Sequence, residues 1–491
     1  MFLAKPGIHF YSILCNEELI IMKTNTQDFE NMSWWALAKA SLASDDRDYT
    51  RIPLKQAVIL LAIPMMLETS VEALFAITDI FFVAKLGAEA IATVGITEAI
   101  ITLLYAVGIG LSMSITALVA RRIGEGDGAR AAVLAGQSIL IGVVLSIAIG
   151  IAGVVYARDV LAFIGASETI LTQFSGYTAI MLGGSATILF LFIFNGIFRG
   201  AGEPVVAMRA IWVASAIHIV LDPCLIFGLG PFPQLGIEGA AIATTFGRGV
   251  GMCYAGFILF NGTARIQLNI GCLKPVVAEM FLLLRVSAGG IAQFFIATSS
   301  WIFLMKIMAE FGSYALAGYT IAIRVIDFII LPVWGLSNSV STLVGQNLGA
   351  NNIQRARQAV FYVAKYNVML MLTIAVLFIA LAEPLVGLFS KEEEVVSIGA
   401  MCLRVLSYGF GLYAIGLVMI QAFNGAGDTF TPTWINGLCF WLFQIPFAYW
   451  FSMQVVNGPS GVFWAILIAE SLMALIALYV FRKGKWVKTA V

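Results

Sequence analysis

The sequence predicts an all-α membrane protein in which twelve transmembrane helices form two six-helix lobes, related by a pseudo-two-fold axis along the membrane normal. The first observation is composition: of 491 residues, 60% are hydrophobic and only 11% are charged, with a mean hydropathy of +0.94. Soluble globular proteins carry about 25% charged residues, so the chain is too apolar for that class. The other two observations are a series of membrane-length apolar segments and an internal repeat.

Twelve apolar segments after Pro53 are long enough to cross a hydrocarbon core of about 30 Å. In chain order they cover residues 54–84, 91–120, 131–156, 169–199, 204–229, 236–260, 275–309, 314–345, 358–382, 394–424, 430–456 and 460–482. The first 52 residues are more polar and lack the pattern of a signal peptide. We interpret them as a flexible cytosolic tail, with Met22 or Met32 as alternative starts of the protein.

Arginine and lysine residues gather in every second loop. They follow the second, fourth, sixth and eighth segments and close the chain: Arg121, Arg122, Arg130, Arg199, Arg209, Arg265, Lys274, Arg355, Arg357, Arg482, Lys483, Lys485 and Lys488. The positive-inside rule therefore predicts that both termini are cytoplasmic. The predicted domains are the tail at 1–52, an N-terminal lobe at 53–261, a cytoplasmic inter-lobe loop at 262–275, a C-terminal lobe at 276–482 and a cytosolic tail at 483–491.

An internal repeat becomes visible when the two halves are shifted by 225 residues. At this shift LGAEA at 86–90 falls on FGSYA at 311–315, VARRIGEGDGARA at 119–131 on VGQNLGANNIQRA at 344–356, and RGAGE at 199–203 on NGAGD at 424–428. Because six spans are an even number, the two copies enter the membrane in the same direction. This predicts that an axis along the membrane normal relates them.

Three carboxylates lie on the first predicted span, between Pro64 and Lys85. At about 100° per residue, the spacing of Glu68, Glu72 and Asp79 places them within roughly 40° of one another on one helical face. An ionised carboxylate in hydrocarbon is costly unless it is protonated, paired or facing water, so such groups usually mark an ion or proton path. A buried structural hydrogen bond is the alternative interpretation.

The repeat shows what the second half carries at the same positions. Glu68 maps to Gln293, Glu72 to Ala297 and Asp79 to Leu304, so the titratable groups occur in the first half alone. This asymmetry favours a single proton-linked site in the N-terminal lobe. We expect a set of further residues to line the cleft between the lobes: Glu68, Glu72, Gln293 and Asn195.

A second constellation lies in the fifth segment, where His218 and Asp222 are four residues apart on one helical face. Imidazole titrates near neutral pH, and an adjacent carboxylate can share or hand on its proton. A satisfied buried pair near Pro223 is the alternative interpretation.

Several chemistries find no support in the sequence. It contains no G-x-x-x-x-G-K-[ST] phosphate loop, no H-E-x-x-H and no G-x-S-x-G motif, and no basic face interleaved with aromatic residues. We therefore expect no cofactor, no nucleic-acid partner and no enzymatic activity, and a transport function would draw on an ion gradient.

The chain resembles the multidrug and toxic compound extrusion (MATE) family, within the MOP flippase superfamily. The resemblance runs from Pro53 to about Arg482 and rests on Ile63-Pro64, the T-D-I at 78–80, the R-G-A-G-E-P at 199–204, the L-D-P at 221–223, the G-I-E-G-A-A-I-A-T at 236–244 and the L-V-G-Q-N-L-G-A at 343–350. It implies the two-lobed fold and the export of cationic or amphipathic compounds in exchange for protons or sodium. It also implies a multi-pass protein of the bacterial inner membrane, which we expect to be a monomer.

Within the family the chain looks most like the DinF-type branch. That resemblance implies that Asp79 and Asp222 are the coupling aspartates and that Thr244 joins their network. The family often has asparagine four residues before the second aspartate, where this chain has His218. Sodium coupling at Asp79 and Asp222 stays an alternative to proton coupling.

The resulting hypothesis is alternating access driven by protonation. A proton taken up at Asp79, coupled to Asp222 and His218, lets the first helix shift or bend near Pro64 and releases the drug. The alternatives are a sodium-coupled drug antiporter, a flippase for a lipid-linked precursor and, more remotely, a polytopic membrane enzyme with the acids as catalysts.

Overall fold

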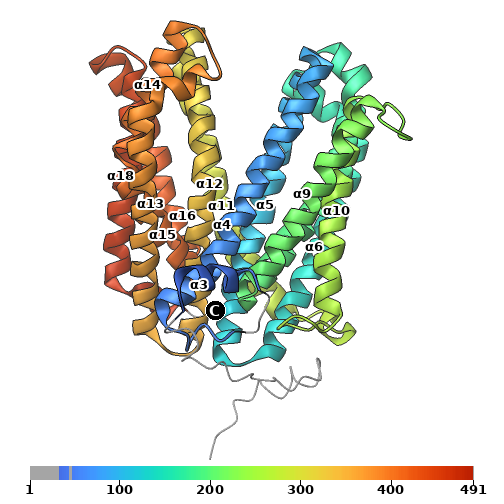
Figure 1. Ribbon diagram of the computed structural model, residues 1–491, viewed down its shortest axis with the longest axis vertical. Helices are drawn as coiled ribbons and strands as arrows, with labels where there is room; N and C mark the ends of the chain where they lie inside the picture. The colour runs from blue at the N-terminus through green and yellow to red at the C-terminus, as the bar shows by residue number, and fades with distance from the viewer. Residues whose placement is uncertain (1–31, 44–46, 490–491) are drawn as a thin grey trace, which may run out of the picture.

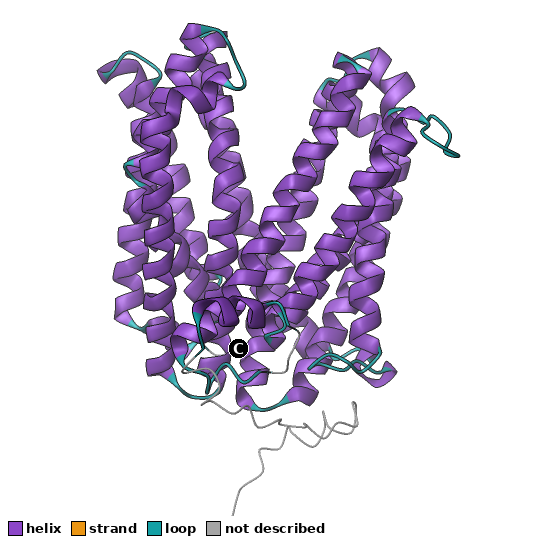
Figure 2. Cartoon of the chain, viewed as in Figure 1, coloured by secondary structure: helices purple, strands orange, loops and turns teal. Residues whose placement is uncertain are grey.

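The computed structural model describes residues 32–43 and 47–489, and the described residues form helices joined by short turns (Figure 2). The first half is built, in chain order, from α4 (Leu54–Val83), α5 (Ala88–Glu125), α6 (Gly128–Ile164), the π-helical segment η2 (Ile170–Phe174), α7 (Ser175–Gly183), α8 (Ser185–Ala201), α9 (Pro204–Phe227) and α10 (Ile237–Phe260). Their long apolar sequences favour helices because only a helix satisfies the backbone of a single segment within a bilayer.

The second half repeats this order with more interruptions. It comprises α11 (Val277–Ala309), α12 (Ser313–Gly349), α13 (Ile353–Gly387), α14 (Glu393–Ser407), α15 (Phe410–Gly425), α16 (Phe430–Asn436), the π-helical η4 (Gly437–Gln444), α17 (Ile445–Trp450), the π-helical η5 (Phe451–Val455) and α18 (Ser460–Lys483). Each of the twelve expected segments is therefore helical.

Three of the expected spans, at 169–199, 394–424 and 430–456, are not single regular helices. Among the described residues, ten helices are long and apolar enough to cross a membrane, and α14 with α15, bent by 60°, makes an eleventh span. The segment predicted at 430–456 alternates between α and π turns, with Pro446 near the start of α17. Proline removes one backbone donor, and π turns commonly interrupt helices at such places.

The backbone confirms the internal repeat. Gly87 and Gly312, 225 residues apart, both precede a long helix with φ of 103° and 94°. Asp127 and Asn352, at the same spacing, each cap the following helix by accepting a hydrogen bond from the backbone N–H three residues on. Equivalent positions in the two halves thus adopt the same local conformation.

The two halves form two lobes that converge at one end of the molecule and diverge at the other (Figure 1). We call the first the closed end; it carries α3 (Trp34–Ser41) and the C-terminus. Small residues allow a close approach there: the Oγ atoms of Ser114 and Ser287 are 2.6 Å apart, and a Cβ on Gly335 would lie 2.4 Å from the carbonyl oxygen of Met65. Between the lobes, a cavity of about 300 Å³ is lined by residues of both, including Glu72 and Trp334.

Part of the predicted N-terminal tail is ordered on the closed end. The helix α3 packs against α4, and the Tyr49 and Ile52 side chains are buried in the core shared with α12 and α13. Residues 1–31 and 44–46 of that predicted tail, including the alternative start Met22, lie outside the described residues. The limits of the predicted domains stay predictions.

Candidate functional site

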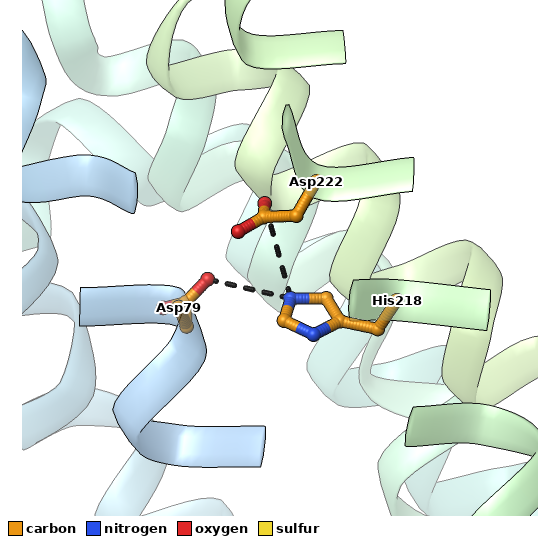
Figure 3. A group of neighbouring side chains, drawn as sticks. All are labelled: Asp79, His218 and Asp222. Carbon is orange, nitrogen blue, oxygen red and sulfur yellow. Dashed lines mark ion pairs between the residues drawn. The ribbon is translucent and has the colours of Figure 1, made fainter. Parts of the chain in front are cut away.

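Asp79, His218 and Asp222 come together between α4 and α9 (Figure 3). The Nε2 atom of His218 lies 3.5 Å from Oδ1 of Asp79 and 3.9 Å from Oδ1 of Asp222. His218 and Asp222 are fully buried, and Asp79 is 8% exposed. The four-residue spacing on α9 places His218 and Asp222 on one face, and α4 supplies Asp79 across the contact between the two helices.

Most polar atoms of this trio make no hydrogen bond within the described part of the chain. Oδ1 of Asp79, both nitrogens of His218 and both carboxylate oxygens of Asp222 are buried and make no hydrogen bond with any described residue. Buried polar groups in native proteins are nearly always hydrogen-bonded, so five such atoms at one place indicate a site for protons, water or an ion. One ligand atom from each residue lies within 4.8 Å of the others, a spacing that could hold a small cation.

An aromatic ring covers one side of the histidine. The rings of Phe75 and His218 stack with centroids 4.0 Å apart. Phe75 precedes Asp79 by one helical turn on α4, so the same helix supplies the carboxylate and the stacking ring. This contact limits the positions that the imidazole can adopt between the two carboxylates.

Thr244, predicted to join the network, is buried on α10 and makes no hydrogen bond with the trio among the described residues. Its helix does reach the site: a Cβ placed on Gly247, three residues further, would lie 3.2 Å from Cβ of His218. The absence of a side chain at Gly247 is what lets α10 approach α9 at this level.

Glu68 is not part of the trio and binds Arg199 and Asn195 instead. Its carboxylate accepts hydrogen bonds from Nη2 of Arg199 at 2.6 Å, from Nε of Arg199 at 3.3 Å and from Nδ2 of Asn195 at 2.9 Å. The two acids share α4, but Glu68 faces α8 and Asp79 faces α9. The acidic stripe of the sequence is therefore split, and Glu68 is held in a paired bridge within the lobe.

Glu72 lies between these two groups and is exposed to the space between the lobes. It also lines a second, much smaller cavity, of about 50 Å³, whose wall includes Phe75, Tyr105 and Arg248. Nη2 of Arg248 donates to the Tyr105 hydroxyl at 2.6 Å, and its guanidinium lies 5.1 Å from the centre of the Phe75 ring. The sequence signal for Arg248 was its position four residues after Thr244, on the same helical face.

The C-terminal lobe contains a cavity of a different character, about 160 Å³ in volume. Gln293 lines it and exchanges hydrogen bonds with Asn424, at 3.1 and 3.3 Å. Its wall holds one carboxylate, Glu470 on α18, together with Trp301, Trp334 and further aromatic residues, and no basic residue. Sequence analysis missed Glu470, although an acid within the last apolar segment was a signal in itself.

These groups can perform proton or cation exchange. Two carboxylates on either side of one imidazole can hold zero, one or more protons, and each state changes the charge buried between α4 and α9. Because α4 also borders the central cavity, a change of charge at the trio can be transmitted to that cavity along one helix.

Comparison with known proteins supports a transport role. The MatE family model matches residues 64–224 and again residues 291–450, once in each lobe. The chain is 25% identical over 431 residues to the FAD transporter of Shewanella oneidensis, covering 88% of this chain and 95% of the relative. It is 26% identical over 441 residues to the probable multidrug resistance protein NorM of Thermotoga maritima, covering 89% and 94%.

A solved structure of similar fold completes the comparison. It is the outward-facing conformation of a multidrug resistance MATE family transporter of the MOP superfamily, with a TM-score of 0.84 and 26% identity over 90% of this chain and 98% of that chain. The twelve-helix fold is thereby confirmed. Since the family model covers more than half of the residues in two lobe-wise matches, the chain belongs to the MatE family and is a multi-pass membrane transporter rather than an enzyme.

Proposed function

We propose that the protein is a secondary exporter that exchanges cationic or amphipathic organic compounds for protons, with Asp79, His218 and Asp222 as the coupling site. The observation that carries this proposal is the buried trio, in which five polar atoms between two transmembrane helices make no hydrogen bond with any described residue. The multidrug names of relatives and of the similar structure support the substrate class.

The distribution of positive charge supports the orientation. Arg130, Arg199, Arg265 and Arg355 all lie at the helix ends or loops of the closed end, so the positive-inside rule places that end in the cytoplasm. The cavity between the lobes then opens to the outside, and the fold represents an outward-open state. A proton arriving from outside reaches α4 through this cavity.

Coupling follows from the cost of buried charge. Ionised Asp79 and Asp222 in an apolar span are destabilising unless a proton or cation joins them, so an arriving proton is held at the trio. Its arrival lowers the charge repulsion between α4 and α9 and lets these helices move closer. Pro64 lacks a backbone N–H inside α4, which makes that helix easier to bend below the site. Bending reshapes the cavity at Glu72 and releases the bound compound.

Two alternatives concern the coupling ion and the charge of the substrate. Sodium can replace the proton, since carboxylate oxygens are suitable ligands for a hard cation. An anionic aromatic substrate is favoured by Arg248, which faces a cavity beside Phe75 and Tyr105, and one relative is named as a FAD transporter. An arginine next to aromatic rings is well suited to a planar, negatively charged molecule.

Transport of a dye into the lumen of inverted vesicles under an imposed pH gradient, acidic inside, compared with an imposed sodium gradient, tests the proposal. We expect transport of a cationic dye under the pH gradient, and a reduction of at least ~10-fold in Asp79→Asn, equal to ~1.4 kcal/mol of coupling free energy. Exposed Glu89, in the same lobe, provides the control Glu89→Gln, which should transport normally. Normal export by a folded Asp79→Asn variant would contradict the proposal. Export under the sodium gradient alone would show that sodium, and not the proton, is the coupling ion.

A further inference from the structure

A short strap at the closed end, residues 47–52, is bonded to the N-terminal lobe. Nη1 of Arg265, in the loop after α10, donates to the carbonyl oxygen of Arg47 at 3.0 Å and to that of Ala201 at 3.2 Å. Ala201 is the last residue of α8, so Arg265 joins the strap to the end of a core helix. The backbone N–H of Arg265 also donates to Glu203 at 3.0 Å, which fixes the loop that carries it.

The same strap is bonded to the C-terminal lobe. Nη2 of Arg355, in the first turn of α13, donates to the carbonyl oxygen of Tyr49 at 3.1 Å and also to that of Ile52. The side chains of Tyr49 and Ile52 are buried in the core formed with α12, α13 and α18. Burial raises the pKa of Tyr49 to about 12, so this phenol stays neutral at physiological pH.

One glycine marks the place where strap and lobes meet. Gly202, with φ of +89°, follows α8 in the N-terminal lobe. A Cβ there would lie 2.9 Å from the ring of Tyr49 and 3.0 Å from the amide nitrogen of Gln346 on α12. At Gly202 the strap therefore packs against both lobes at once. If the lobes separate at this place, the strap must leave one of them.

The helix before the strap presents two tryptophans to the surroundings. Trp34 is 62% exposed and Trp35 is 84% exposed, while Leu37 of the same helix is buried against the protein. The helix lies across the direction of the spans at the closed end (Figure 1). Nη2 of Arg47 donates to the carbonyl oxygen of Ala40 at 2.7 Å and so ties this helix to the strap.

We propose that α3 and residues 47–52 form a membrane-anchored latch, in which Trp34 and Trp35 insert into the interfacial layer of the cytoplasmic leaflet and the strap holds the two lobes together at that end. Tryptophan prefers the boundary between headgroups and acyl chains, and a short helix lying in the membrane plane is the usual way to present it there. The latch stabilises the state that is closed to the cytoplasm. It lies outside the residues matched by the family model, 64–224 and 291–450, and it rests on the orientation and alternating access proposed above.

Hydrogen exchange of the full chain in lipid nanodiscs tests whether the strap holds the two lobes together at the closed end. Arg355→Gln removes the guanidinium that binds Tyr49 and Ile52, and we expect the amides at the closed end of α8 and α12 to exchange at least ~10-fold faster. Arg357→Gln is the matched control. Arg357 lies two residues after Arg355 on α13, is exposed, and makes no hydrogen bond to the strap among the described residues. Arg265→Gln releases the other side of the strap and gives an independent reading where Arg355→Gln folds poorly.

Quenching of tryptophan emission by lipids brominated near the headgroup end of the acyl chain tests the anchor. We expect the wild type to lose more emission than Trp34→Phe/Trp35→Phe, and the difference to come from these two rings. Equal quenching in both proteins overturns the anchor, and unchanged exchange in both Arg355→Gln and Arg265→Gln overturns the latch. Neither measurement uses a substrate or an ion gradient, so a failure of proton-driven efflux in the wild type is recognised separately.

Discussion

The two lobes build the same helix-to-helix bridge from different chemistry. In the N-terminal lobe, Glu68 of α4 binds Arg199 of α8 as a buried ion pair, with the closest atoms 2.6 Å apart. In the C-terminal lobe, 225 residues further on, Gln293 of α11 and Asn424 of α15 exchange neutral amide hydrogen bonds. The repeated fold thus requires a hydrogen-bonded bridge at this position, and it does not require charge.

The coupling trio shows the same contrast more sharply. At the 225-residue spacing, Asp79, His218 and Asp222 fall on Leu304, Phe443 and Phe447. Leu304 is buried in the lobe core, and the two phenylalanine rings stack 5.1 Å apart.

This contrast identifies which charges serve the fold and which serve transport. Apolar residues at three equivalent positions are enough to complete the C-terminal lobe. The charges retained at those positions in the N-terminal lobe, at a cost in stability, therefore indicate function.

The largest effect on stability is expected from Arg199→Ala. This change leaves Glu68, which is 1% exposed, as a buried carboxylate that keeps its hydrogen bond from Asn195 but loses its positive partner, at a cost of about 3–5 kcal/mol. The equivalent change in the other lobe, Asn424→Ala, removes a neutral partner while Gln293 keeps its bond to the Thr429 carbonyl, at a cost of about 1 kcal/mol. Unfolding of both variants in the same detergent compares them, and equal losses would contradict the distinction between the bridges.

A smaller effect is expected when the N-terminal bridge is converted into the C-terminal one. Glu68→Gln/Arg199→Asn replaces the ion pair by an amide pair and leaves no buried charge, so its stability should lie within about 1 kcal/mol of the wild type. A double-mutant cycle with the two single variants measures the coupling. If the double variant is as unstable as Arg199→Ala, the ion pair is a structural requirement of this lobe and the comparison fails.

The smallest effect is expected from Arg248→Met, which introduces the residue found 225 positions later, Met473. Loss of the guanidinium beside Phe75 and Tyr105 should raise the KM for a flavin phosphate about 3–10-fold if that anion is transported, equal to roughly 1 kcal/mol. Transport of a cationic dye should change by no more than about twofold, within ordinary variation for a group that does not bind it. Exposed Arg285 on α11 offers the control Arg285→Met. A KM that rises for the dye and not for the flavin phosphate contradicts the assignment of Arg248 to anions.

Sequence patterns were most informative where local geometry governs the result. The four-residue spacing of His218 and Asp222 fixed their common face, and the 225-residue shift matched Gly87 with Gly312, which adopt the same backbone conformation. The helical face of Glu68, Glu72 and Asp79 was less informative, because neighbours on α8 and α9 decide which partner each carboxylate meets. Glu470 lines a cavity whose wall is formed by several helices, and no pattern along the chain predicts which residues meet there.

By itself, the sequence determined the apolar spans, their number, the repeat and the charge asymmetry between the lobes, because each depends on composition and periodicity along the chain. Tertiary structure alone decided that Glu68 pairs with Arg199 while Asp79 meets His218, since residues 131 and 139 positions apart come together through helix packing. It also decided that residues 47–52, expected to be flexible, lie bonded between two lobes. Such contacts depend on how preformed helices pack in space, and that packing leaves no periodic trace in the sequence.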